Sequence, residues 1–186
     1  ACVCEGMINV GIDTIAARLA GTCKRRDGYV ENIAGRPGTA SEGVVGIDQA
    51  DLNGVDQFGL RGSLRFTPTP DLTIDLVATY EEQSNPGTAF VSGTIPATGG
   101  DTSPFTPSEL GGSPVSESVL GLDELGLERS VFDISGTIEY SFGDNWTLTS
   151  ITGYREFDSL EVFDADGSAL FFLEFAEEAL GDQFSH

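Results

Sequence analysis

The stretch that decides the fold is VDQFGLRGSLRFTPTPDLTIDLVATYEE, residues 55–82. Its first half alternates apolar and polar residues, and the apolar set runs from Phe58 to Phe66. Alternation with a period of two is typical of a β-strand. Because proline fixes φ and lacks an N–H donor, Pro68 is expected to end the strand, with residues 68–71 forming a tight turn. The alternation then resumes, so the stretch predicts a long hairpin with one apolar face and one polar, charged face.

The length of these strands narrows the choice of fold. Strands of soluble proteins are most often about five or six residues long. A strand that crosses a membrane as part of a β-barrel needs about 9–11 residues, apolar on the lipid side and polar on the inner side. Aromatic residues form girdles at both membrane borders, and Phe58, Phe66 and Tyr80 stand at strand ends here. The hairpin alone fits either a transmembrane barrel or a large soluble sheet.

Composition sets the structural class and excludes one kind of partner. The 186 residues are enough for one domain, they include 24 glycines, and 39% are hydrophobic. Phe, Thr, Ser, Val and Ile fill the patterned segments, which favours an all-β fold. No apolar run approaches eighteen residues, so no membrane helix is expected. The net charge of −21 disfavours nucleic-acid binding, which needs a basic surface.

The same two-residue alternation recurs along the chain and predicts an antiparallel meander of long strands. The facing of the segment after Gly143 is ambiguous, because Trp146 and Leu148 share one parity whereas Ile151 has the other. The expected strands span about residues 7–10, 14–27, 55–67, 72–82, 131–142 and 146–158, and another begins at 182–186.

Connections of two very different lengths separate these strands. Tight turns are expected at residues 11–13, 68–71 and 143–145, and long loops at 28–54, 83–130 and 160–181. In a meander this order places short turns at one end of the sheet and long loops at the other. Long irregular loops are uncommon in compact domains, but bacterial outer-membrane barrels combine short periplasmic turns with long extracellular loops. The pattern therefore favours part of a transmembrane β-barrel.

Side chains suited to catalysis or metal binding are scarce. The single histidine, His186, leaves no histidine-based triad, so an enzyme is not expected. Three cysteines cannot all pair within one chain, and Cys2, Cys4 and Cys23 are interpreted as structurally incidental. The segment 164–167 resembles part of a calcium loop but lacks the later oxygen ligands. No metal site and no cofactor are expected.

Four segments resemble a known family in order and in spacing. They are RDGYVEN at 26–32, LRGSLRFTP at 60–68, WTLTSITGYR at 146–155 and DQFS at 182–185. Each is similar to a segment in the early barrel strands of TonB-dependent outer-membrane receptors. The resemblance covers nearly all of the chain beyond about residue 8, although Cys23 stands where the family usually has an aromatic residue.

The resemblance implies a 22-stranded barrel closed by an N-terminal plug domain, in the outer membrane of a Gram-negative bacterium. Such a receptor takes up a scarce nutrient, for example a ferric siderophore, with energy delivered by a TonB protein through the plug. Outer-membrane lipid and lipopolysaccharide would be its other partners. The plug, the segment that contacts TonB and most of the strands are absent here. We therefore expect the chain to be an internal piece of such a receptor.

The alternation of the strands and the composition of the loops indicate candidate ligand-binding residues. Basic side chains on the polar face could guide an anionic ferric complex, or could only solvate the lumen and form ion pairs. Loops tend to carry binding residues. The candidates are Arg18, Lys24, Arg61 and Arg65 on the polar face, and the aromatic residues Tyr29, Phe90 and Phe105 in the loops.

A function of another class stays open at this point. The chain could be a secreted all-β adhesin or a carbohydrate-binding module. Such a protein would need both faces of its sheet covered or solvated. The apolar face between Phe58 and Phe66 argues against this alternative.

Overall fold

The computed structural model describes residues 1–31, 51–87, 125–143, 145–165 and 174–186. Within these ranges every regular element is a β-strand, and no helix is long and apolar enough to cross a membrane. The strands are β1 (Cys2–Ile12), β2 (Ile15–Arg26), β3 (Val30–Glu31), β4 (Asp51–Leu52), β5 (Val55–Thr69), β6 (Leu72–Pro86), β7 (Gly126–Phe142), β8 (Trp146–Asp164) and β9 (Glu174–Ser185).

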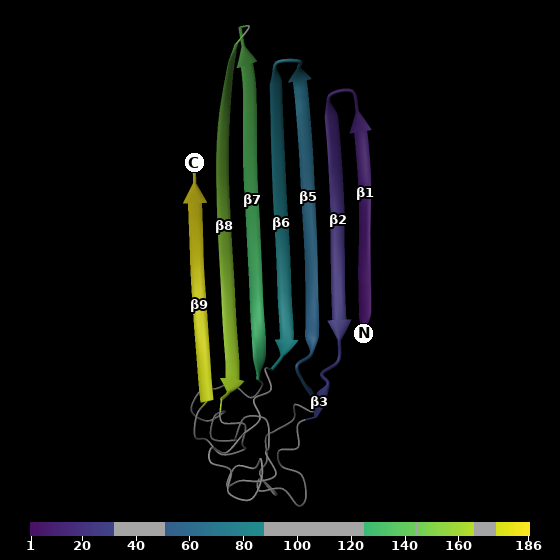
Figure 1. The fold of residues 1–186 in the computed structure, drawn as a ribbon, viewed down its shortest axis with the longest axis vertical. Helices are drawn as coiled ribbons and strands as arrows, with labels where there is room; N and C mark the ends of the chain where they lie inside the picture. The colour runs from purple at the N-terminus through teal and green to yellow at the C-terminus, as the bar shows by residue number, and fades with distance from the viewer. Residues whose placement is uncertain (32–50, 88–124, 144, 166–173) are drawn as a thin grey trace, which may run out of the picture.

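Seven strands form one antiparallel sheet in the order β1-β2-β5-β6-β7-β8-β9 (Figure 1). The prediction of an all-β antiparallel meander is therefore confirmed. The two remaining strands, β3 and β4, pair with each other as a short ribbon after β2. The seven-stranded sheet is open, with β1 and β9 at its edges.

The short connections lie together at one end of the sheet. β1 turns into β2 after Ile12, β5 turns into β6 at Pro70 and Asp71, and β7 turns into β8 after Phe142. Figure 1 shows these three turns at successive heights along the sheet. The predicted loops 28–54, 83–130 and 160–181 leave from the opposite end, and large parts of them lie outside the described residues.

The expectation that Pro68 ends its strand is wrong. β5 continues to Thr69, and the pairing with β6 changes register between Phe66 and Thr69. A proline is tolerated at such an irregularity because no regular ladder hydrogen bond is required of it there. The turn itself is confined to Pro70 and Asp71.

The other strands also extend beyond their predicted limits, mostly toward the end opposite the short turns. β1 begins at Cys2, β7 at Gly126 and β9 at Glu174, while β8 continues to Asp164. Neither face of these extensions is consistently apolar: in β9, for example, Glu178 and Leu180 share one face, whereas Phe175 and Glu177 share the other. The apolar–polar period is therefore broken, and the pattern gave no sign of the continuing strands.

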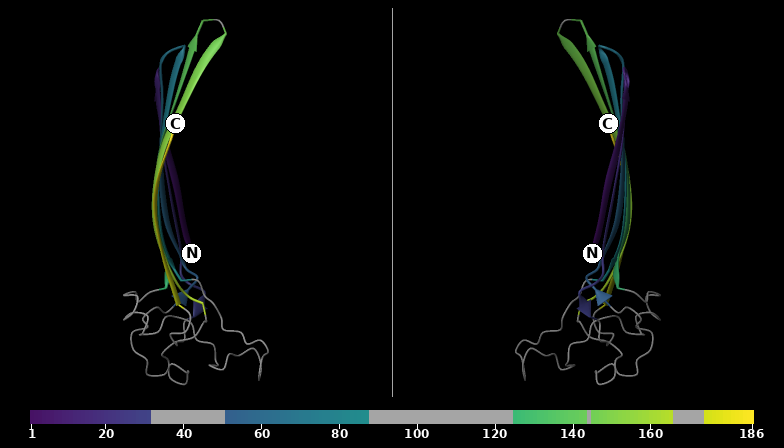
Figure 2. Two further views of the ribbon diagram at one scale, coloured as in Figure 1. Left: turned by 90° about the vertical axis from the view of Figure 1, so that its left-hand side faces the viewer. Right: turned by 90° about the vertical axis from the view of Figure 1, so that its right-hand side faces the viewer.

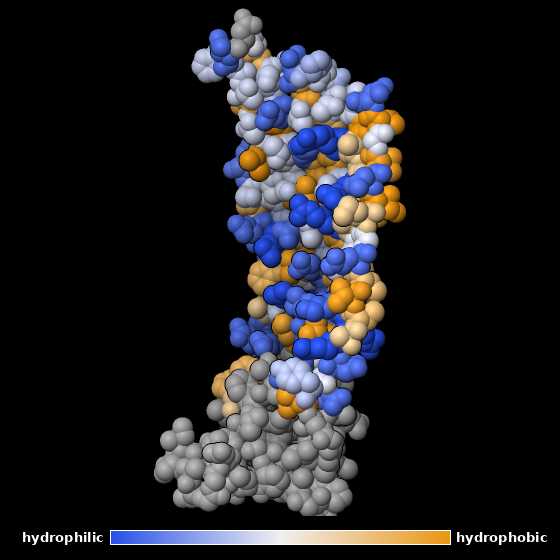
Figure 3. Space-filling view, turned by 45° about the vertical axis from the view of Figure 1, so that its right-hand side comes forward, coloured by the Kyte–Doolittle hydropathy of each residue, from blue (hydrophilic) through white to orange (hydrophobic). Residues whose placement is uncertain are grey.

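The sheet is a single curved and twisted layer (Figure 2). Among the described residues only four hydrophobic side chains are buried: Leu52, Leu125, Val131 and Val162. Large hydrophobic side chains such as Ile12, Leu148 and Phe184 are instead more than half exposed. In Figure 3 hydrophobic residues run as a vertical strip along the right-hand edge, whereas hydrophilic residues occupy much of the face toward the viewer. The described strands therefore lack the two-sided core of a soluble sandwich.

Candidate functional site

One side of the sheet, here called the apolar face, is set by the strand register. Residues that are directly opposite on neighbouring strands project from the same side of a sheet. The row through Val10, Ala17, Leu64 and Leu76 is one example. Neighbouring rows of this face add Ile8, Ile12, Ile15, Leu19, Leu60, Ile74, Ala78, Ile134 and Ile138.

Two lines of aromatic residues border the apolar face. The loop-side border, nearer the long loops, consists of Phe58, Tyr80, Phe132, Tyr154 and Phe184. The turn-side border, nearer the short turns, consists of Phe66, Tyr140, Phe142 and Trp146. Between these borders no described side chain of the apolar face is Asp, Glu, Lys or Arg.

Charge begins immediately beyond the loop-side border. Asp56, Glu82, Glu156 and Asp182 each lie two residues outward of a border aromatic on the same face. The hydroxyl of Tyr80 donates to Glu82 Oε2 at 3.2 Å, and the hydroxyl of Tyr154 donates to Glu156 Oε2 at the same distance. We call the part of the apolar face between the two borders the apolar band. Each tyrosine therefore has its apolar ring at the edge of this band and its hydroxyl directed toward the charged residues outside it.

Both borders cross the sheet obliquely and in parallel. Phe58 is opposite Glu82, so the border on β6, at Tyr80, lies two residues closer to the turns. Phe132 is opposite Glu156, so the border on β8, at Tyr154, lies two residues closer to the short turns than the border on β7. On the turn side the line moves in the same direction, from Phe66 to Tyr140 and then to the facing pair Phe142 and Trp146.

β8 and β9 carry the polar exceptions within the band. The register places Trp146, Leu148 and Tyr154 on the apolar face and Ile151 on the opposite face, which resolves the facing of this strand. Thr152 continues the apolar-face row of Gly136, and its hydroxyl lies 2.7 Å from Nδ1 of His186. These two polar groups satisfy each other.

The opposite side, here called the polar face, carries all four basic candidates of the sequence analysis. The register places Arg18, Lys24, Arg61 and Arg65 on it together. It also holds Arg129 and Arg155, which the sequence analysis missed. Arg129 precedes the predicted start of its strand, and Arg155 lies in the strand whose facing was ambiguous. Only the register reveals that these two side chains belong to the set.

The basic residues of the polar face differ in their contacts. Arg65 makes a two-pronged pair with Asp75, at 2.7 Å from Nε to Oδ1 and 2.8 Å from Nη2 to Oδ2. Arg155 Nε lies 3.8 Å from Asp133 Oδ2, and Arg18 Nη2 lies 2.8 Å from the Met7 sulfur. Neither Lys24 nor Arg61 forms an ion pair with another described residue.

The polar face has a shallow depression of about 580 Å³ beside Arg61. The small residues Ala20, Thr22, Gly59 and Thr79 line it together with Arg61. Glu5 and Glu81 also line it. The hollow therefore combines one cation with two carboxylates and small polar groups.

The roots of the long loops are fastened together at the loop end of the sheet. Leu52 is fully buried against Leu125 and Val162, and Val30 and Leu160 pack around them. We call Leu52, Gly87, Leu125 and Val162 the loop-base clasp. Asn53 N donates to Gly87 O at 2.7 Å, and Gly87 N donates to Leu125 O at 2.9 Å. These hydrogen bonds connect the β3–β4 ribbon to the ends of β6 and β7.

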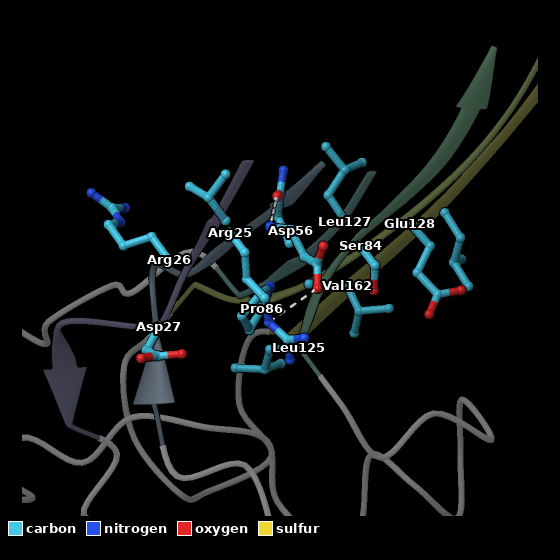
Figure 4. Close-up of a pocket in the computed structure, with 14 residues that line it drawn as sticks. Arg25, Arg26, Asp27, Asp56, Ser84, Pro86, Leu125, Leu127, Glu128 and Val162 are labelled. Atoms are coloured by element: carbon cyan, nitrogen blue, oxygen red, sulfur yellow. Dashed lines mark hydrogen bonds and ion pairs between the residues drawn. The ribbon is translucent and has the colours of Figure 1, made fainter. Parts of the chain in front are cut away.

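A cleft of about 380 Å³ lies beside this clasp (Figure 4). Arg25, Asp56 and Glu128 contribute charged side chains, and Pro86 and Leu125 contribute apolar ones. Arg25 Nε lies 3.6 Å from Asp56 Oδ2, and Asn85 Oδ1 accepts a hydrogen bond from Asp56 N at 2.9 Å. The mixed charges of this cleft are therefore partly neutralised among themselves.

The three aromatic candidates of the loops have different outcomes. Tyr29 lies beside the clasp, where its backbone N donates to Leu52 O at 3.1 Å. The residue is 70% exposed, and its ring centroid lies 5.0 Å from the Arg26 guanidinium carbon, a cation–π distance. Phe90 and Phe105 lie outside the described residues.

Within the described ranges, no group of three or more His, Cys, Asp or Glu side chains is arranged to hold a metal ion. Comparison of the chain with family models, curated proteins and solved structures finds no match.

The clasp can be tested by adding one methyl group. A Cβ on Gly87 would lie 2.8 Å from Leu125 Cβ and 2.9 Å from Leu52 Cδ2, so neighbours must move. We expect Gly87→Ala to lower the free energy of unfolding by about 1–3 kcal/mol, as overpacking of buried sites does. The measurement is a urea titration followed by circular dichroism in detergent.

The matched control is Gly62→Ala, because a Cβ on Gly62 meets nothing within 4 Å. We expect this substitution to leave stability unchanged or to raise it slightly, since alanine restricts the unfolded chain. Equal effects of the two substitutions would show that the clasp is not closely packed.

The polar face provides a second prediction, on ion pairing. A planar two-pronged contact restricts geometry more than a single long one, so Arg65–Asp75 should couple more strongly than Arg155–Asp133. Double-mutant cycles with Arg65→Met and Asp75→Asn, and with Arg155→Met and Asp133→Asn, measure the two coupling energies. Larger coupling in the second pair would contradict this ranking.

Proposed function

We propose that this sheet forms part of a transmembrane β-barrel in the outer membrane of a Gram-negative bacterium. The apolar face would contact lipid and the polar face would line the lumen. The observation that carries this proposal is the uncharged apolar band between two parallel aromatic borders. A single-layer sheet with so much exposed apolar surface needs an apolar surrounding, and lipid is the surrounding that aromatic girdles delimit.

The slope of the borders supports this placement quantitatively. The loop-side border shifts by two residues between β5 and β6 and by two more between β7 and β8. That is about 14 Å along the strands, over about 14–19 Å across them. Borders that lie parallel to a membrane then require a strand tilt of about 35–45°, which is the tilt of strands in membrane barrels.

The height of the band agrees as well. From Phe58 to Phe66 the strand rises about 27 Å. At the tilt given above, this corresponds to about 19–22 Å across the membrane, close to the roughly 25 Å apolar band of outer-membrane barrels. Nothing in a soluble sheet would relate the positions of aromatic residues on different strands in this way.

Within that barrel, we infer TonB-energised uptake of a scarce nutrient such as a ferric siderophore. The inference rests on the resemblance of four sequence segments to TonB-dependent receptors, and on two polar-face cations, Lys24 and Arg61, that form no ion pair with another described residue. Lys24 and Arg61 would attract an anionic ferric complex toward the lumen. The TonB protein would act through a plug domain, and outer-membrane lipid and lipopolysaccharide would surround the barrel.

Membrane placement can be tested with two neighbouring positions. In a chain whose cysteines are replaced by serine, Leu64→Cys and Ser63→Cys each receive a nitroxide spin label. Leu64 is on the apolar face and Ser63 on the polar face. After reconstitution with phospholipid, we expect dissolved oxygen to relax the label at 64 more strongly, and a water-soluble nickel chelate to relax the label at 63 more strongly.

Equal access of the nickel chelate to both labels would refute the lipid-facing assignment. So would recovery of the chain as a monomer in the aqueous supernatant after vesicles are removed. Either result would favour the secreted adhesin or carbohydrate-binding alternative.

Uptake can be tested by removing a cation either from the polar face or from the apolar face. Lys24→Gln and Arg61→Gln remove polar-face cations, whereas Arg25→Gln removes the cation next to Lys24 on the opposite side of the sheet. In the intact receptor, we expect either polar-face variant to lower the affinity for an anionic ferric catecholate about fivefold, a loss typical of one partly solvated charge. The measurement is iron uptake by iron-starved cells, corrected for receptor abundance.

Arg25→Gln should leave this affinity unchanged, because Arg25 lies on the face directed away from the proposed lumen. Loss of its exposed contact with Asp56 should also cost little stability. Equal losses in all three variants would mean a general charge effect. Uptake that does not depend on the receptor at all would exclude the transport function.

A further inference from the structure

The three cysteines of the chain converge on one corner of the sheet. Cys2 and Cys4 lie on the edge strand β1, Cys23 lies on β2, and all three belong to the same face. Cys4 and Cys23 are directly opposite each other in the strand register. The sulfur atoms of Cys2 and Cys4 lie 3.9 Å apart. Residues that the sequence analysis interpreted as incidental are therefore a cluster of thiols.

We propose that Cys4 and Cys23 form a specific cross-strand disulfide site, and that Cys2 remains a thiol. A disulfide needs Cα atoms about 4.4–6.8 Å apart with side chains directed at each other. Opposite residues of antiparallel strands are about 4.5 or 5.5 Å apart at Cα, within this range in either type of pair. The register thus places Cys4 and Cys23 at bonding separation without movement of the backbone.

The two competing pairs are less suitable. Cys2 and Cys4 are two residues apart on one extended strand, about 6.8 Å at Cα, with parallel side-chain directions. Cys2 and Cys23 are diagonal neighbours, for which about 7–8 Å is typical. Both Cα–Cα distances lie at or beyond the limit for a disulfide. The short distance between the Cys2 and Cys4 sulfur atoms is therefore not sufficient for a bond.

The oxidant is a small or protein disulfide, and the reaction is thiol–disulfide exchange. One thiol of the pair loses its proton and attacks one sulfur of the donor, which releases the first donor thiolate. The other thiol then loses its proton, attacks the protein sulfur of this mixed disulfide and displaces the second donor thiolate. Cys4 and Cys23 are oxidised by two electrons, the donor is reduced to two thiols, and the two protons end on those thiols.

The structural effect would be to fix the pairing of β1 with β2, its neighbour in the sheet. A covalent link near the N-terminal end of β1, combined with the tight turn after Ile12, would close β1 and β2 into a ring. The pairing depends only on the β1–β2 register and is therefore independent of whether the sheet enters a membrane.

The test is disulfide mapping on the full chain, refolded in detergent and equilibrated with oxidised and reduced glutathione. Trypsin cleaves after Arg18 and Lys24, so a Cys4–Cys23 bond links the peptides 1–18 and 19–24. We expect this linked pair in the mass spectrum, with one thiol per chain still reactive to maleimide. Cys2→Ser should keep the link, whereas Cys4→Ser and Cys23→Ser should lose it.

The matched control moves one thiol by one residue. Thr22→Cys combined with Cys23→Ser places the thiol on the opposite face of β2, at the position opposite Glu5. The linked peptides should then disappear, although the chain still contains three cysteines. A link that persists in this control, a link that survives in Cys4→Ser, or a dominant bond within peptide 1–18 would each overturn the proposal.

Discussion

The register of seven antiparallel strands is the constraint on which the rest of the structure depends. Because successive side chains of a strand alternate between the two faces, a slip of one residue would exchange the faces of that strand. The observed pairing places Leu64 beside Ala17 and Leu76, and Arg65 beside Asp75. Hydrophobic and charged side chains are thereby separated across the thickness of one sheet, and no other described residues form a second layer over either side.

This separation explains why the described strands have so little core of their own. Burial in apolar surroundings contributes about 25 cal/mol for each Å² of apolar surface removed from water. A face that carries Ile8, Leu19 and Ile138 leaves this contribution unused while it remains in water. The few buried side chains instead gather at the loop-base clasp, where Leu52 meets Leu125 and Val162. The exposed apolar side chains therefore lie on one face of the sheet, and the closely packed ones lie at its loop end.

The sequence predicted well wherever one face of a strand is apolar. Alternation from Phe58 to Phe66 located β5 and its facing, and the same parity placed Arg18 and Arg61 on one side. It failed where apolar and polar residues are mixed on each face, as at the start of β7 and the end of β8, because the period of two is broken there. It also could not relate one strand to another. The oblique borders, the clasp around Gly87 and the opposition of Cys4 and Cys23 all require the register.

The loop-base clasp has a consequence for how this chain can vary. Hydrogen bonds from Asn53 to Gly87 and from Gly87 to Leu125 join the roots of two loops, so the spacing of those roots is set below the loops themselves. Residues inserted or deleted between 31 and 51, or between 87 and 125, would then leave the wall of strands unchanged. The clasp thus separates a sheet whose strand ends are held at a fixed spacing from loops whose length and sequence can change without rebuilding the sheet.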